Sequence, residues 1–230
     1  MDHPKSIAER LFAQQERLRK AAQEHGRDPR GIKLIAVSKR HSVEAIRAAY
    51  AAGQRDFGEN YVQELLDKAQ QLSELTDIVW HMIGHLQSNK ARHVAPLAHA
   101  VHTVSSVSLA LELGKRARGR SAALRTLVEV NVSGEESKSG CTPTELPQVL
   151  EAIEAEPSLQ LAGLMTMPPF DEDPALTRPH FEHLRGLREE HGGALRLPEL
   201  SMGMSHDMEV AIAAGSTMVR IGTAIFGERS

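Results

Sequence analysis

The stretch Lys33-Leu34-Ile35-Ala36-Val37-Ser38-Lys39 decides the fold, because it is the first clear β-strand in the chain. Its short, continuous apolar run is typical of a buried strand. Lys39 closes the run. A lysine at the carboxyl end of such a strand is unusual, because lysine is seldom buried unless it is paired or chemically active. This residue is therefore the first candidate for a functional role.

Short apolar strands then alternate with amphipathic segments, which is the pattern of parallel βα units. The predicted strands cover residues 33–39, 55–58, 78–83, 100–104, 126–132, 161–165, 199–202 and 218–221. The predicted helices between them include residues 43–52, 61–72, 109–118, 145–156, 178–191 and 208–214. Eight strands in alternation with helices predict a closed (β/α)8 TIM barrel, and 230 residues is close to the lower end for that fold.

An extra helix is expected before the first strand. Ser6 and Glu9 have the spacing of a capping box, which predicts a polar helix over residues 7–24 that stops near Gly26. An open doubly wound sheet is the competing architecture, but neither G-x-G-x-x-G nor G-x-x-x-x-G-K-[ST] follows any predicted strand. Because no change in composition marks a linker, we expect one barrel domain over residues 1–230.

A second chemical signal lies near the end of the chain. The segment Ser201-Met202-Gly203-Met204-Ser205 leaves the seventh predicted strand, and Arg220-Ile221-Gly222-Thr223 leaves the eighth. In a barrel, phosphate is commonly bound after these two strands by glycine backbone, hydroxyl groups and free N–H groups. Strands one and eight are neighbours once the barrel closes. A nucleophilic Lys39 beside a phosphate site suggests a phosphorylated aldehyde held as a Schiff base.

Composition excludes several classes of protein. Hydrophobic residues make up 41% and charged residues 25%, which suits a globular core, and the net charge of −3 gives no basic surface for nucleic acid. One cysteine excludes an internal disulfide and favours a cytoplasmic setting. We expect no secretion signal and no membrane span, since no apolar run approaches roughly 20 residues. Without an obvious apolar surface stripe, a monomer is expected.

Other reactive side chains carry weaker signals. His81 and His85 flank a strand end without a third ligand, so no metal site is expected. Lys90 and Lys138 are rival amines, but both lie among polar loop residues, where a solvated cation is the simpler interpretation. Cys141 lacks any activating neighbour in the sequence, and we expect it to be unreactive.

Seven blocks of sequence carry a resemblance to a known family. They are VSK at 37–39, FGENYVQE at 57–64, WHMIGHLQSNK at 80–90, SKSG at 137–140, GLMTM at 163–167, LSMGMS at 200–205 and the run 214–227. Together they resemble the pyridoxal phosphate homeostasis proteins, whose barrel is related to the amino-terminal domain of alanine racemase. The similarity extends over nearly the whole chain. Long blocks of this kind are far more specific than any single short motif.

The resemblance implies a set of cofactor-binding residues. Lys39 would bind pyridoxal 5′-phosphate (PLP) covalently as an internal aldimine. Ser205, Gly222 and Thr223 would hold the phosphate, with Ser201 and Gly203 shaping that loop. Arg220 would face the pyridine nitrogen. The side chains expected to line the ring are those of Asn60, His81 and Met165.

The arginine argues against turnover. PLP acts as an electron sink when its pyridine nitrogen is protonated, and a permanent cation at that position disfavours the protonation. Racemases that resemble this chain add a base from another domain, whereas here the chain ends at Ser230 and contains only two tyrosines, Tyr50 and Tyr61. We therefore expect no catalytic residues and a reversible carrier that supplies PLP to apoenzymes within the cell.

Two other functions remain open at this stage. One is an enzyme, a PLP-dependent amino-acid racemase or a Schiff-base lyase of narrow specificity. The other is an aldolase-like barrel that binds a phosphosugar directly on its lysine. Both use the same nucleophilic amine, so only their chemistry with ligands separates them from the carrier.

Overall fold

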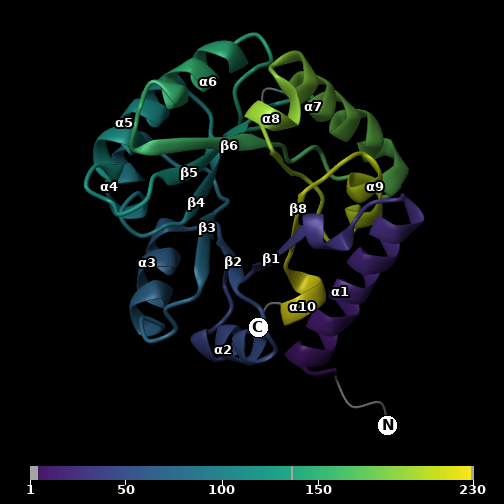
Figure 1. Cartoon of the computed structure of the whole chain (residues 1–230). Helices are drawn as coiled ribbons and strands as arrows, with labels where there is room; N and C mark the ends of the chain where they lie inside the picture. The colour runs from purple at the N-terminus through teal and green to yellow at the C-terminus, as the bar shows by residue number, and fades with distance from the viewer. Residues whose placement is uncertain (1–4, 136, 229–230) are drawn as a thin grey trace.

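Eight parallel strands form a closed barrel at the centre of the protein (Figure 1). The structure is a computed structural model that describes residues 5–135 and 137–228. Each strand pairs with the next in chain order, and β1 pairs with β8 to close the ring. The strands are β1 (Lys33–Val37), β2 (Asp56–Glu59), β3 (Val79–Met82), β4 (Ala100–Val104), β5 (Leu124–Glu129), β6 (Leu159–Met165), β7 (Glu199–Ser201) and β8 (Met218–Ile221).

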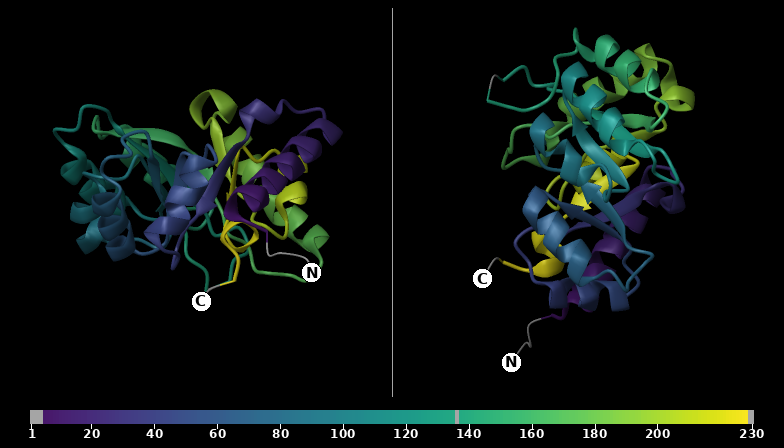
Figure 2. Two further views of the ribbon diagram at one scale, coloured as in Figure 1. Left: turned by 90° about the horizontal axis from the view of Figure 1, so that it is seen from below. Right: turned by 90° about the vertical axis from the view of Figure 1, so that its left-hand side faces the viewer.

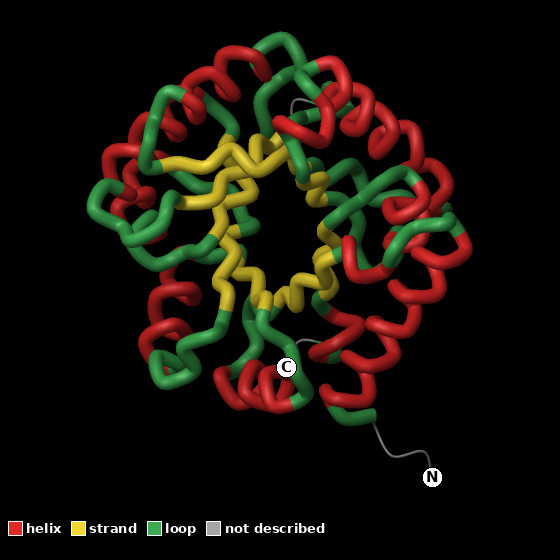
Figure 3. The backbone as a smooth tube through the Cα atoms, in the orientation of Figure 1, coloured by secondary structure: helices red, strands yellow, loops and turns green. Residues whose placement is uncertain are grey.

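Helices surround the barrel on its outer side (Figure 3). They are α1 (Ile7–Glu24), α2 (Val43–Ala51), α3 (Val62–Gln71), α4 (Ala91–Val94), α5 (Val107–Ala117), α6 (Leu146–Glu154), α7 (Arg178–Glu190), α8 (Gly193–Arg196), α9 (Met208–Ala213) and α10 (Thr223–Phe226). Short 3₁₀ turns cover Pro29–Gly31, Ser88–Lys90 and Pro174–Thr177. None of the helices in the described ranges is long and apolar enough to cross a bilayer.

The predicted (β/α)8 barrel with an extra amino-terminal helix is confirmed. The capping box is present, because the Ser6 hydroxyl accepts from the Glu9 N–H and the Glu9 carboxylate accepts from the Ser6 N–H. The single-turn helices α4, α8 and α10 were not predicted. A helix of one turn is too short to show a 3.6-residue pattern.

The end of the first strand differs from its prediction. The strand stops at Val37, two residues before Lys39. Ser38 still donates its N–H to the Gly58 carbonyl, but the chain then turns, and the His41 N–H is donated back to the Ser38 carbonyl. Arg40 takes a left-handed backbone conformation with φ of 62°. Lys39 therefore lies in a turn beyond the strand.

The core has two parts. A large cluster fills the space between the strands and the helices, and a small one fills the inside of the barrel. The inner cluster consists of Ile35, Leu127, Ala162, Met165 and Met218. Polar residues that point inward occupy the rest of the interior, so the barrel is a packed core with a polar side and not a pore.

Helix α1 packs against α9 and α10, the helices that follow β7 and β8 (Figure 2). Leu11 and Leu18 are buried on its inner face. Arg10 donates to the carbonyls of Ile225 and Phe226, at 2.6 and 3.2 Å, and so satisfies carbonyls at the end of α10. The extra helix thus supports the same side of the barrel that carries the last two βα loops.

Candidate functional site

Lys39 lies half-buried at the carboxyl-terminal end of the barrel, in the turn after β1. The turn is held from the neighbouring βα unit, because the Arg40 N–H donates to the Glu64 carboxylate at 2.7 Å. The guanidinium of Arg40 also lies over the ring of Tyr61, 5.5 Å from its centroid. These contacts pin the backbone on one side of Lys39.

A buried ion pair holds the residue that precedes Lys39. The Lys68 amine donates to the Ser38 carbonyl and to the Glu59 carboxylate, both at 2.8 Å. The Ser38 hydroxyl donates to the same Glu59 oxygen at 2.6 Å. Burial raises the pKa of Glu59, although Lys68 and Ser38 act against that rise. This pair fixes Ser38 and with it the direction in which the next residue leaves the strand.

Sequence reasoning missed Glu59 and Lys68. Glu59 lies inside a block used for the family resemblance, and Lys68 reads as a solvated lysine on a polar helix face. The available signal is the i, i+4 spacing of Glu64 and Lys68, which form an ion pair at 2.7 Å. That spacing alone does not reveal the tertiary partner.

Arg220 points into the barrel, and its neighbour in register on β1 is Ile35. One terminal nitrogen donates to the Ser201 hydroxyl at 2.7 Å and the other to the Thr166 carbonyl at 3.0 Å. Burial lowers the pKa of Arg220 to about 10, so the guanidinium keeps its charge at neutral pH. Of the two orientations open to a mid-strand arginine, the structure has the one directed at the site.

Two acidic side chains provide the negative field around Arg220. They are Asp207, which follows the β7 loop, and Glu129, the last residue of β5. Burial raises the pKa of Glu129 to about 7, and the positive charge of Arg220 offsets only part of that rise. Sequence reasoning placed Glu129 inside a predicted strand but gave it no role.

The β7 and β8 loops meet next to the Lys39 turn. Gly203 has φ of +94°, and a Cβ there would lie 2.4 Å from the Ala211 side chain, so the loop requires glycine at this position. A Cβ on Gly222 would lie 3.4 Å from the Val37 carbonyl oxygen. Gly222 therefore packs against the end of the strand from which Lys39 emerges.

The rest of the predicted phosphate-binding loop is also placed by local contacts. The Asp207 carboxylate accepts from the Met204 N–H at 2.6 Å, and the Ser205 carbonyl accepts from Arg17 of α1 at 3.4 Å. Thr223 is exposed at the first position of α10. Hydroxyl groups and glycine backbone thus gather at one end of the barrel, which is the donor chemistry that a phosphate needs.

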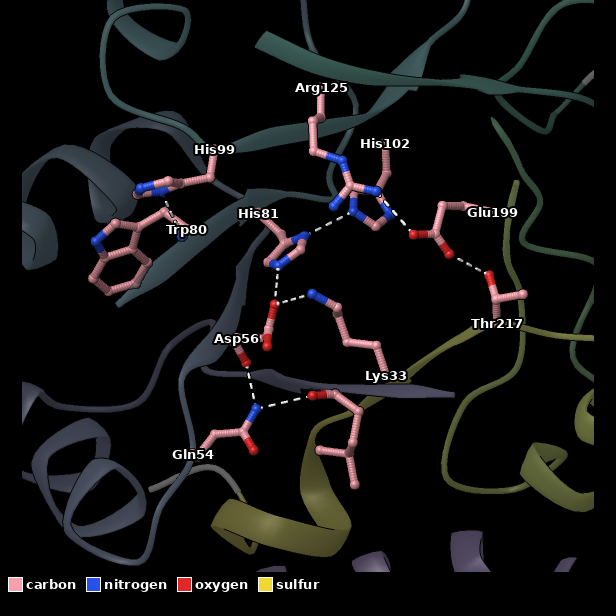
Figure 4. A network of polar contacts seen from close by, with 11 residues as sticks. Lys33, Gln54, Asp56, Trp80, His81, His99, His102, Arg125, Glu199 and Thr217 are labelled. Atoms are coloured by element: carbon pink, nitrogen blue, oxygen red, sulfur yellow. Dashed lines mark hydrogen bonds and ion pairs between the residues drawn. The ribbon is translucent and has the colours of Figure 1, made fainter. Parts of the chain in front are cut away.

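The residues expected to line the ring occupy different depths. Asn60 follows β2 at the same end as Lys39, and Met165 belongs to the small cluster inside the barrel. His81 is fully buried further down, where one ring nitrogen contacts His102 and the other contacts Asp56, each at 2.9 Å (Figure 4). Both nitrogens of His81 are therefore engaged within the protein.

Buried oxygens without partners test whether a polar ligand fits here. In the described part of the chain, the buried side-chain oxygens that have no hydrogen-bond partner are Glu59 Oε2, Asn60 Oδ1 and Glu129 Oε2. All three residues lie at or just after the carboxyl end of a strand. Buried polar atoms are normally paired, so these oxygens can accept hydrogen bonds from a bound ligand. The hydroxyl and N–H groups of the β7 and β8 loops are the part of the site that suits an anionic group.

The other candidates take ordinary positions. His85 is exposed while His81 is buried, and the residues in 5–135 and 137–228 contain no group of three or more His, Cys, Asp or Glu suited to a metal ion. Burial raises the pKa of Cys141 to about 12, so its thiol is protonated at neutral pH. Lys90 is exposed in a 3₁₀ turn.

Comparison with known proteins gives the family. The profile of the alanine racemase amino-terminal domain matches residues 10–230. A pyridoxal phosphate homeostasis protein of Pseudomonas aeruginosa is 46% identical over 97% of this chain and 96% of its own length, and one of Escherichia coli K12 is 44% identical over 97% of each. The chain belongs to the pyridoxal phosphate homeostasis protein family.

Solved structures agree with this assignment. PipY of Synechococcus elongatus, solved with PLP bound, is 38% identical, with a TM-score of 0.80 over 96% of this chain and all of its own. Alanine racemase of Corynebacterium glutamicum is 21% identical, with a TM-score of 0.65 over 94% of this chain and 60% of its own, which is a likeness of fold. The family resemblance noted in the sequence is confirmed.

Proposed function

We propose that this member of the pyridoxal phosphate homeostasis family binds PLP reversibly through a Schiff base on Lys39 and so buffers the free cofactor. The observation that carries the proposal is the packing of Gly222 against the end of β1. It brings the anion-binding loops beside the turn of Lys39, with the guanidinium of Arg220 directed into the barrel between them. The relatives' name and the PLP-bound PipY structure support the same ligand.

Each residue of the proposed site has a defined task. Ser205, Gly222 and Thr223 bind the phosphate, and Gly203 shapes their loop. Ser201 holds Arg220 toward the pyridine nitrogen through the bond between their side chains. The ring is lined by Asn60 at the mouth, with Met165 and His81 beneath it. The proposed unit is one PLP-binding barrel domain over residues 1–230.

The proposed partners of the ring support a non-catalytic role. An arginine opposite the pyridine nitrogen weakens the electron sink that PLP chemistry requires. The hydroxyl groups of both tyrosines are hydrogen-bonded within the protein, which argues against either of them acting as a second base. The Tyr50 hydroxyl donates to Asp77 at 2.6 Å, and the Tyr61 hydroxyl accepts from Arg40 at 3.1 Å. We further propose that the protein is a cytoplasmic monomer that passes PLP to apoenzymes.

A titration of the protein with PLP tests the covalent step. The visible absorption of a Schiff base should appear in the wild type, and borohydride reduction followed by peptide mapping should place the adduct on Lys39. The Lys39→Ala variant should lose this band. Lys90→Ala removes an exposed amine in the 3₁₀ turn after β3 and serves as the matched control. A full band in Lys39→Ala would show that another amine carries the ligand.

Proton exchange separates the carrier from an enzyme. Amino acids incubated in D₂O with catalytic amounts of the PLP-loaded protein should keep their α-proton if the protein is a carrier. Rapid exchange with any amino acid would support a racemase or lyase in its place. Adducts trapped by borohydride with sugar phosphates in colourless protein would support the aldolase-like alternative.

A further inference from the structure

A continuous chain of polar side chains crosses the interior of the barrel and ends at Arg220. Its members come from six different strands, and adjacent members lie within 3.0 Å of each other. They are Lys33 on β1, Asp56 on β2, His81 on β3, His102 on β4, Ser201 on β7 and Arg220 on β8. Figure 4 shows the part from Lys33 to His102.

The two ends of this chain lie at opposite ends of the barrel. Lys33 and Asp56 are the first residues of their strands, and both line a cavity of about 630 Å³ at the amino-terminal end. Arg220 belongs to the proposed PLP site at the carboxyl-terminal end. His81, His102 and Ser201 between them are each 0% exposed, so water does not interrupt the chain there.

The chemistry of the ends determines which atom donates at every step. Arg220 can only donate, so the Ser201 oxygen accepts from it at 2.7 Å. A serine oxygen has two lone pairs, so this bond alone does not fix whether Ser201 donates to or accepts from His102 Nδ1, 2.9 Å away. The direction of that bond, and of the 2.9 Å bond between His102 Nε2 and His81 Nδ1, is set at the other end by Asp56.

The last step ends on a carboxylate. The ionised Asp56 can only accept, so His81 carries its proton on Nε2 and donates it to Asp56 at 2.9 Å. With neutral rings, His81 Nδ1 then accepts from His102 Nε2, and His102 Nδ1 accepts from the Ser201 hydroxyl. Asp56 also accepts from the Lys33 amine at 3.0 Å. The reverse order would place an unprotonated His81 nitrogen against the carboxylate, where two acceptors repel each other. All the bonds from Arg220 to Asp56 therefore point one way.

We propose that Asp56, His81 and His102 are positioning residues that orient the Ser201 hydroxyl and, through it, Arg220 from the far end of the barrel. This inference rests on the proposed function for the identity of the ligand that Arg220 meets. Burial lowers the pKa of His81 and lowers that of His102 well below its ordinary value, which agrees with two neutral rings. A chain with a single direction leaves the Ser201 lone pairs turned toward Arg220.

The ionised Asp56 carboxylate fixes the direction of these hydrogen bonds, because it can only accept. Burial alone would raise the pKa of Asp56, but the hydrogen bonds from His81 and Lys33 and the positive charge of Lys33 lower it. An amide in its place could either donate or accept, so the Asp56→Asn variant would allow both directions. In the reversed order the Ser201 oxygen would accept from His102 as well as from Arg220, and its hydroxyl would turn to another acceptor. The bond from Arg220 to Ser201 would then be less fixed in direction than its bond to Thr166.

Nitrogen-15 NMR of histidine in the PLP-free protein tests the chain without any ligand. We expect His81 and His102 both to have a protonated Nε2 and an unprotonated Nδ1 at neutral pH. In Asp56→Asn, a second set of signals with protonated Nδ1 should appear, and the guanidinium signals of Arg220 should broaden. A protonated Nδ1 on either histidine of the wild type would overturn the proposal, whether or not the variants fold.

PLP binding provides the second readout. Asp56→Asn and His102→Gln should weaken PLP several-fold and change the spectrum of the bound cofactor, although neither residue lies in the βα loops. His99→Gln is the matched control, because His99 accepts only the Trp80 backbone N–H at 3.1 Å and lies outside the chain. Unchanged affinity and spectrum in both folded variants would overturn the positioning role. A wild type that binds no PLP would refute the proposed function. The histidine signals would still show whether the hydrogen bonds between Arg220 and Asp56 have the proposed direction.

Discussion

At the scale of single residues, Glu129 makes the stability of the protein depend on pH. Burial favours its neutral form and raises its folded pKa from 4.5 to about 7. Between these two values, the folded protein binds more protons than the unfolded chain does. Stability therefore falls as the pH rises through this window, and the loss is complete above the folded pKa.

The Glu129→Gln variant should remove this dependence. A neutral amide keeps the size of the side chain but does not ionise, so the variant should lose less stability between roughly pH 5 and pH 8 than the wild type, by up to about 3 kcal/mol. Urea unfolding at both pH values measures the difference. The exposed glutamate on α6, Glu151, supplies the control variant Glu151→Gln. Equal losses in wild type and Glu129→Gln would show that Glu129 is ionised without penalty.

Single residues also show where sequence reasoning stops. Lys39 and Arg220 could be found because a charge inside an apolar strand stands out. The same signal was present at Glu129 and would have identified it. Lys68 and His102 could not be assigned partners, because their contacts join segments 9 to 30 and 21 to 99 residues away in the chain. Such contacts depend on how the strands are brought into register.

At the scale of elements, α1 links the two proposed phosphate-binding loops. Arg10 donates to carbonyls of α10, and Arg17 forms an ion pair with Glu209 of α9 at 2.7 Å. The capping box starts the helix, and its apolar face covers both partner helices. The sequence predicted this helix to the residue, but nothing in it indicated which loops the helix would support.

Arg10→Ala should therefore weaken the binding of PLP. Losing the bonds to Ile225 and Phe226 frees α10 to move, and one or two hydrogen bonds of about 1 kcal/mol each correspond to a several-fold loss of affinity. Fluorescence or absorption titration measures it. Arg19→Ala on the same helix is the control, because Arg19 pairs only with exposed neighbours, Glu16 and Gln23. Equal affinities for the two variants would contradict a supporting role for α1.

At the scale of the whole molecule, the order of the strands was the most predictable feature. Parallel βα units pair with their sequential neighbours, so eight of them lead to a closed ring once their number is known. The predicted strands matched within about two or three residues, apart from the missed turn after β1. The polar interior could not be predicted, because it depends on which inward positions share a level of the barrel.

Ligand binding should stabilise the entire barrel, because the proposed site joins its first and last strands. At PLP concentrations about 100 times the dissociation constant, linkage predicts about 2.7 kcal/mol, or a rise in melting temperature of roughly 5–10 °C for a chain of this size. Differential scanning calorimetry measures the rise, and Lys39→Ala should lose most of it. If the variant melts with the same rise, the Schiff base is not the main source of the stabilisation.

The contact between Gly222 and Val37 also has a consequence for biosynthesis. Lys39 leaves the ribosome early, whereas Gly222 of the proposed phosphate site follows more than 180 residues later. If PLP is held as proposed, a nascent or truncated polypeptide would carry the Lys39 amine without the loop that binds the phosphate. Binding would then require the completed barrel, and separation of β1 from β8 would release the cofactor.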